Sequence, residues 1–215
     1  MSKRGHLLLA VQLLLIVIFL LLGCISTITV KQDSVKFRER AEKLPLSVGL
    51  FLSDTMKNYL MPGEIASDTL NFEIGKAIEA SAIESLKKVF HDVSLIQEKA
   101  AISPNIQRIV IIEFSPSSKF IYGGATLSEH TATVELLCEV YDRKWNILWK
   151  GTANGSVTRT TGEAGVASLI IGMLGESIQL KELGKIVNES LTAALENLND
   201  QIMILGKDAI MGNKK

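Results

Sequence analysis

The chain is poor in the residue types that build reactive or covalently braced sites. Its 215 residues include two cysteines, three histidines and four prolines. With so few cysteines, a disulfide framework is excluded. Lysine plus arginine and aspartate plus glutamate are balanced at 23 each. The chain therefore lacks the excess positive charge of a nucleic-acid-binding protein, and we expect no nucleic-acid partner.

Recognisable catalytic motifs are also missing. The sequence contains no Gly-x-Ser-x-Gly elbow, no His-Glu-x-x-His pair and no Walker loop. Cys138 and His130 are the one thiol and imidazole pair to consider for nucleophilic catalysis. Cys138 lies in an alternating apolar stretch and is expected to point inward, whereas a catalytic cysteine needs a partly exposed, electropositive setting. We therefore predict that the protein is not an enzyme and holds neither a cofactor nor a metal.

The first 24 residues have the layout of a secretory signal. Lys3 and Arg4 precede an apolar run from Leu7 to Leu22, and the run ends in Leu-Leu-Gly-Cys at Cys24. Two other interpretations remain open. A membrane-spanning helix needs about 20 apolar residues, and this run has about 16. An ordinary cleaved signal needs a small-x-small site, which Leu21 fits poorly.

The Leu21-Leu22-Gly23-Cys24 sequence resembles the lipobox of bacterial lipoprotein signal peptides. The resemblance implies that residues 1–23 are removed and that Cys24 is acylated, so that lipid chains hold the protein on a membrane. Lipoproteins without aspartate directly after the cysteine go to the outer membrane. Because Ile25 and Ser26 follow here, the resemblance implies the periplasmic face of the cell outer membrane.

The rest of the chain divides into a tether, one domain and a tail. Residues 24–43 are polar and crowded with charge, which predicts a solvated tether or, alternatively, a partner-binding arm. Residues 44–205 have the length and hydrophobic content of a single domain with its own core. Residues 206–215 are expected to be a flexible tail.

Hydrophobic periodicity predicts an α+β fold for this domain. Asn71 is a candidate N-cap for the first of two amphipathic helices. The expected strands are 46–52, 93–96, 108–114 and a hairpin of 132–140 with 146–153, and the expected helices are 73–93 and 180–202. Residues 53–72 and 115–129 are predicted to be long loops. This order favours a mostly antiparallel sheet with two amphipathic helices packed on one face.

Two stretches are candidate partner-binding surfaces. Residues 164–175 contain no charged side chain. They are either tucked against the sheet or form a surface that meets a partner subunit or lipid. The second stretch is the 53–72 loop. The candidate contact residues are Leu169, Ile170, Ile171, Met173 and Leu174 in the first stretch, with Tyr59 and Met61 in the second.

Beyond the lipobox, the chain resembles small periplasmic domains related to the amino-terminal domain of TolB. The strand at 46–52 before a helix carries the resemblance, together with Tyr141 to Gly151, which is similar to a Gly-x-Ile-x-Trp-x-Gly hairpin except for the turn glycine near Trp145. The resemblance implies a non-catalytic accessory lipoprotein that docks onto an envelope assembly or transport complex. The alternatives are an oligomeric secretion or pore subunit and a carrier of a lipid or other apolar ligand.

Overall fold

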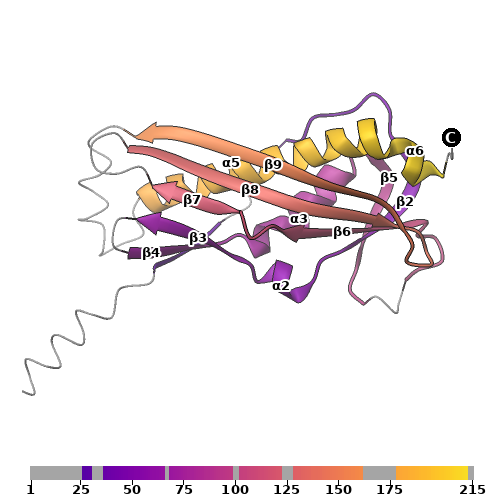
Figure 1. Cartoon of the computed structure of the whole chain (residues 1–215), viewed down its shortest axis with the longest axis horizontal. Coiled ribbons are helices and arrows are strands. Elements are labelled where there is room, and N and C mark those ends of the chain that lie inside the picture. The colour runs from indigo at the N-terminus through magenta and orange to yellow at the C-terminus, as the bar shows by residue number, and fades with distance from the viewer. Residues whose placement is uncertain are drawn as a thin grey trace, which may run out of the picture.

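The computed structural model describes residues 26–30, 36–65, 68–98, 102–122, 128–161 and 178–212. Within them, helices and a nine-stranded sheet share one chain (Figure 1). In order, the elements are β1 (Ser26–Thr29), β2 (Leu44–Phe51), α2 (Asp54–Lys57), β3 (Leu60–Ile65), β4 (Asp68–Glu73), α3 (Gly75–Leu86), β5 (Phe90–Ile96), β6 (Arg108–Phe114), β7 (Lys119–Tyr122), β8 (Ser128–Tyr141), β9 (Ile147–Thr161), α5 (Ile178–Gln201), the π-helix η2 (Ile202–Gly206) and α6 (Lys207–Met211).

Strand β8 is the centre of the sheet. Its whole length pairs with β9, and its other side pairs first with β7 and then with β6. At the junction of β7 and β6, the Ser118 hydroxyl accepts from the Glu135 amide at 3.0 Å and donates to the Glu135 carbonyl at 3.1 Å. The Ser115 amide donates to the same carbonyl at 2.8 Å. At this point the neighbour of β8 changes from β7 to β6, and these bonds satisfy the backbone groups of Glu135 that neither strand pairs with.

The α+β class is confirmed, but the prediction of a mostly antiparallel sheet is wrong because the sheet is mixed. The strand order is β1-β4-β3-β7-β8-β6-β2-β5, with β9 paired to β8. Strands β1 with β4, β3 with β7, and β2 with both β5 and β6 run parallel. The 53–72 and 115–129 stretches contain β3, β4 and β7 rather than loops. These strands combine antiparallel pairings of β3 with β4 and of β7 with β8 with parallel pairings to strands distant in the chain, β1 with β4 and β3 with β7.

Helix α5 packs against β8 and β9, which form the hairpin predicted from alternation. Its apolar stripe is buried, including Leu183, Val187, Leu191 and Leu198, each no more than 2% exposed. Burying each such side chain contributes roughly 1.5–3 kcal/mol to folding. Helix α5 also contacts α3, where the buried Asn199 amide donates to the Ser85 carbonyl and hydroxyl at 3.1 and 2.9 Å.

Residues 26–30 and 36–43 are packed onto the domain, so the prediction of a solvated tether at 24–43 is wrong for them, whereas residues 24, 25 and 31–35 lie outside the described residues. Ile28 and Val30, in and after β1, are buried, and so is Phe37. Residues 36–43, called the strap below, form ion pairs with α5, with α6 and with the turn that follows α3. These pairs are Arg38–Asp200 (2.6 Å), Arg40–Asp200 (2.8 Å), Glu39–Lys88 and Glu42–Lys207 (2.9 Å). The charge crowding that suggested a tether thus reflects partners distant in the sequence.

The carboxyl-terminal residues also differ from the prediction. We expected a flexible tail from residue 206, but η2 and α6 continue the helical structure to Met211. Ile210 is 0% exposed, and the Arg108 side chain donates to its carbonyl at 2.7 Å. The tail prediction is therefore wrong for residues 206–212, whereas residues 213–215 lie outside the described residues.

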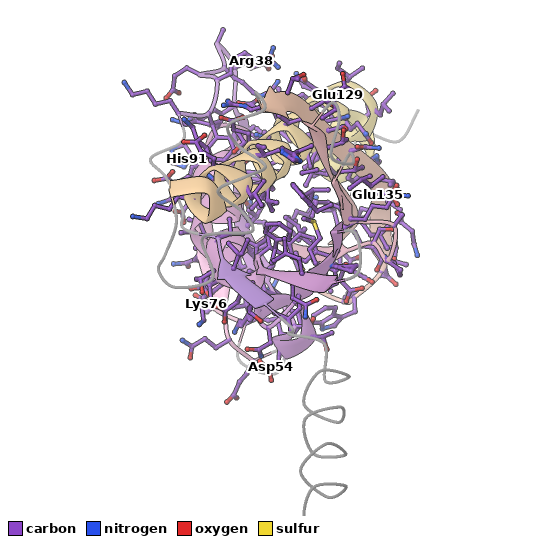
Figure 2. All side chains as sticks on the ribbon, turned by 90° about the vertical axis from the view of Figure 1, so that its left-hand side faces the viewer. Arg38, Asp54, Lys76, His91, Glu129 and Glu135 are labelled. Atoms are coloured by element: carbon purple, nitrogen blue, oxygen red, sulfur yellow. The ribbon has the colours of Figure 1, made fainter. Side chains whose placement is uncertain are left out.

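Helix α3 is shorter than predicted. It begins after Ile74, with no side-chain cap, and Asn71 lies in β4 instead of capping the helix. The charged side chains of Arg38, Lys76 and Glu135 lie on the periphery of the molecule in Figure 2. Among the helices of the described residues, none has the length and hydrophobicity needed to cross a bilayer.

Candidate functional site

The sequence-predicted site residues fall into two groups. Cys24 and the 164–175 segment, with Leu169, Ile170, Ile171, Met173 and Leu174, lie outside the described residues, and so does the signal at 1–23. Their roles stay predictions. Met61, by contrast, is placed in β3 with a 0% exposed side chain. The expectation that Met61 contributes to a contact surface is therefore wrong for this fold.

Tyr59 contributes to the core more than to the surface. Its half-buried ring stacks on Phe114 with 4.5 Å between ring centroids. Burial raises the pKa of Tyr59, and a hydrogen bond with Ser118 opposes that shift. The side chain thus joins the segment after α2 to the junction between β6 and β7, and we assign it no partner contact.

Cys138 and His130 do not form a catalytic pair. Both lie on β8 and are 1% exposed. Burial raises the pKa of the Cys138 thiol, with a smaller contribution from Glu139, and burial lowers the pKa of His130. The two residues are eight positions apart along the strand, which places their Cα atoms about 26 Å apart. The prediction that Cys138 points inward is confirmed, and no proton can pass directly between the two groups.

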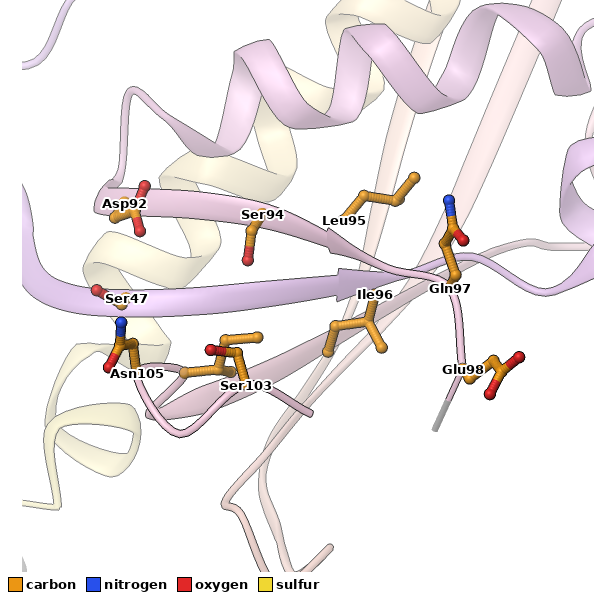
Figure 3. Close-up of a pocket in the computed structure, with 10 residues that line it drawn as sticks. Ser47, Asp92, Ser94, Leu95, Ile96, Gln97, Glu98, Ser103 and Asn105 are labelled. Atoms are coloured by element: carbon orange, nitrogen blue, oxygen red, sulfur yellow. The ribbon is translucent and has the colours of Figure 1, made fainter. Parts of the chain in front are cut away.

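A polar groove of about 530 Å³ lies where β2, β5 and the chain before β6 meet (Figure 3). Three of its lining residues, Leu95, Ile96 and Ile106, are apolar. The polar lining residues are Ser47, Asp92, Ser94, Gln97, Glu98, Ser103 and Asn105. Hydroxyl, amide and carboxylate groups at such a groove can bind hydrogen-bond donors, and the two carboxylates favour a neutral or cationic group.

Local packing explains why the groove forms here. The backbone amide of Gln107 donates a hydrogen bond to the Ser47 carbonyl at 2.8 Å, which holds the chain before β6 against β2. A Cβ at Gly49 would lie 2.3 Å from Cδ1 of Ile96 and 3.0 Å from Cδ1 of Ile106. Glycine at this position therefore lets both isoleucines lie over β2. Sequence reasoning missed the groove because its residues come from three separate segments, and glycine within a strand was the one available signal.

Metal binding has no support among the described side chains. No group of three or more histidine, cysteine, aspartate or glutamate residues in the described ranges could hold a metal ion.

The comparisons with known proteins concern the fold. No protein-family model matches the sequence, and no curated protein resembles it in sequence. Among solved structures, a Xanthomonas campestris protein assigned to the family model DUF330 is similar with a TM-score of 0.53 at 12% identity, covering 86% of this chain and 98% of that one. This likeness establishes a shared fold. A minor lipoprotein from Acinetobacter baumannii has a TM-score of 0.44 at 11% identity, over 75% of this chain and 92% of that one, which does not establish one. The resemblance to the TolB amino-terminal domain stays a prediction.

Proposed function

We propose that this chain is a lipid-anchored, non-catalytic accessory protein of the bacterial cell envelope. In this proposal, acylated Cys24 holds the protein on the periplasmic face of the outer membrane, and the folded domain docks onto an envelope protein complex. The lipobox-like sequence at Leu21 to Cys24 supports the anchor. The complex itself is identified only by its class.

The position of β1 is the observation that carries the proposal. Strand β1 begins at Ser26, two positions after Cys24. It pairs with β4, and its Ile28 side chain is 7% exposed. An anchor at Cys24 would therefore be joined almost directly to the sheet. Such a domain is confined to the membrane surface, which suits a protein that supports a membrane-bound complex.

Two regions of the chain are candidates for docking in this proposal. The uncharged 164–175 segment, including Ile170, remains the first candidate from the sequence. The polar groove beside β5 is the second, because β5 is the last strand in the sheet order. The groove does not favour a carrier of apolar ligands, since most of its lining residues are polar.

Mass spectrometry of intact protein from a bacterial host tests the anchor. We expect a chain cleaved before Cys24 and carrying diacylglycerol and an additional acyl chain. The Cys24→Ala variant should keep residues 1–23 and gain no lipid. A wild-type chain that still carries residues 1–23 without any lipid would overturn the proposal.

Site-directed photo-crosslinking in intact cells tests the docking. A photoreactive amino acid is placed at Ile170 or Ser94, with exposed Lys76 on α3 as the control position. We expect adducts with an envelope protein from one of the first two positions and not from the third. Adducts between two copies of this chain would instead favour the oligomeric secretion subunit, and the absence of adducts at both test positions would contradict docking.

A further inference from the structure

Several strand ends lie together at one end of the sheet. Ser128 at the start of β8 pairs with Thr161 at the end of β9. Next to them, Tyr122 ends β7, and β7 runs parallel to β3, which ends at Ile65. Strand β4 begins at Asp68, opposite the end of β3 at Ile65. Strand β1 runs parallel to β4, so its first residue, Ser26, lies at the same end of the sheet. We call it the anchor end.

The β8–β9 turn marks the opposite end. Strand β8 runs from Ser128 to Tyr141, a length of about 45 Å at the usual rise of an antiparallel strand. The groove lies near this turn. Its residue Ser47 directly precedes Val48, which pairs with Arg108 at the start of β6. The next residue of β6, Ile109, pairs with Tyr141, the last residue of β8 before the turn. Figure 1 shows the β8–β9 turn and α6 together at this end.

Chain length keeps Cys24 near the anchor end. A fully extended chain covers at most about 3.6 Å per residue, so the Cα atom of Cys24 stays within about 7 Å of Ser26. That distance is small compared with the length of β8. Lipid chains on Cys24 would therefore bring the anchor end, and not the β8–β9 turn, to the bilayer surface.

Exposed charged residues occur at both ends of the sheet. The β8–β9 turn has Arg143 and Lys144, and the anchor end has Glu129 and Arg159. Charge therefore does not distinguish the two ends, and the orientation rests on chain length and on the apolar residues at the anchor end. At the anchor end, Thr161 and Ile178 are the described residues that flank the uncharged 164–175 sequence in the chain. Apolar Ile121, near the end of β7, is 44% exposed there.

We propose that the anchor end of the sheet rests on the lipid bilayer, so that the strands rise from the membrane and the polar groove beside β5 faces away from it. This inference rests on the proposed acylation of Cys24. It adds an orientation that acylation alone does not define, because a long tether would let the domain turn freely.

The test measures the distance of three exposed positions on β9 from the membrane surface. Thr160, Ser156 and Thr152 are spaced by four residues, which is about 13 Å for each step along the strand. Each is changed to cysteine in the full chain and labelled with a fluorophore. Background labelling is low because Cys138 is 1% exposed and an acylated Cys24 has no free thiol.

The labelled proteins are reconstituted into phosphatidylethanolamine–phosphatidylglycerol vesicles that carry a spin label on the lipid headgroup. We expect the label at residue 160 to lose most of its fluorescence, the label at 156 to lose less, and the label at 152 to lose little. Glu129→Cys on β8, whose side chain points outward at the anchor end in Figure 2, should behave like 160. Lys144→Cys in the turn should behave like 152.

Failure of the orientation and failure of the anchor give different results. Equal quenching at 160 and 152 in a chain that floats with the vesicles and carries lipid by mass spectrometry would overturn the orientation alone. A chain without lipid that does not float would overturn both proposals. Far-ultraviolet circular dichroism of each variant confirms that the substitution leaves the fold intact.

Discussion

At the scale of single residues, Gly155 sets how closely β9 approaches α5. A Cβ at this position would lie 2.1 Å from the Ser190 carbonyl oxygen and 2.3 Å from the Ala194 amide nitrogen. Both are backbone atoms of a packed helix, so rotation of a side chain cannot relieve the contact. The Ser190 hydroxyl also donates to the Ala132 carbonyl at 2.8 Å, which fixes the helix to β8 at the same level.

Gly155→Ala should therefore lower the free energy of unfolding by roughly 1–3 kcal/mol, the usual cost of overpacking a core. Urea unfolding of the full chain in detergent, followed by circular dichroism, measures the change. Gly184→Ala is the matched control, because its Cβ would lie 3.7 Å from Cγ2 of Ile28, an ordinary contact. Because alanine is more favourable than glycine within a helix, the control substitution should raise the free energy of unfolding by up to about 1 kcal/mol. Equal stabilities of the two variants would contradict the close approach.

Single residues show what local sequence can and cannot predict. The inward direction of Cys138 followed from alternation with its strand neighbours, and the structure confirms it. The role of Gly155 was not predictable, because the helix backbone that it meets lies more than thirty positions later in the chain. Met61 was assigned to a loop surface for the same reason, since its buried setting depends on strands distant in sequence.

At the scale of elements, η2 and α6 combine exposed and buried apolar side chains. Ile204 and Leu205 in η2 are 77% and 69% exposed, whereas Ile210 in α6 is fully buried. The aromatic ring of Trp149 lies beside Gly206, where a Cβ would be 3.3 Å from the indole. The carboxyl-terminal residues of η2 and α6 therefore contact the core through Gly206 and Ile210, whereas Ile204 and Leu205 are exposed to solvent.

Ile210→Ala should lower the free energy of unfolding by about 2–5 kcal/mol, because it removes buried methyl groups and leaves a cavity. Ile204→Ala is the control and should change it by no more than about 0.5 kcal/mol. Chemical unfolding of the full chain, monitored by tryptophan fluorescence, compares the two. Similar small effects would show that α6 does not contribute to the core and would restore the flexible-tail prediction.

Long periodic elements were predictable, and short strands were not. The pattern of β6, the β8–β9 hairpin and α5 is repeated over enough residues to give a clear period. The bounds of β6 and α5 match the prediction closely, whereas β8 and β9 extend beyond the predicted 132–140 and 146–153. Strands β1, β3, β4 and β7 have four to six residues each, and β3 contains Pro62 and Gly63. Their identity as strands comes from pairing with distant partners, which hydrophobic period alone does not encode.

At the scale of the whole molecule, the strap joins segments that are far apart in the chain. Glu42 and Lys207, for example, are 165 positions apart, and their side chains form an ion pair. Exposed ion pairs contribute little individually. Arg40 differs because its side chain is 13% exposed and lies 2.8 Å from Asp200 and 3.8 Å from Glu196. The strap should thus stabilise the fold chiefly through the Arg40 contacts.

The pKa of Asp200 makes that contribution dependent on pH. Burial raises the pKa of this carboxyl group, but the Arg40 and Arg38 guanidinium groups outweigh burial and hold it below its usual range. A folded-state pKa below the unfolded value stabilises the fold fully above the unfolded pKa of about 3.9. That stabilisation is lost as pH falls through the folded-state pKa, when the carboxylate is protonated in both states.

Asp200→Asn should therefore be less stable than the wild type near neutral pH, and the difference should shrink as pH falls below about 4. Urea unfolding at a series of pH values gives the free energy of unfolding for each protein. Asp92→Asn, which removes an exposed carboxylate away from the strap, is the control for the loss of a surface charge. A stability difference for Asp200→Asn that is the same at every pH would show that the strap is not held by this charge. In that case packing of Phe37, which is 5% exposed, would have to hold the strap in place.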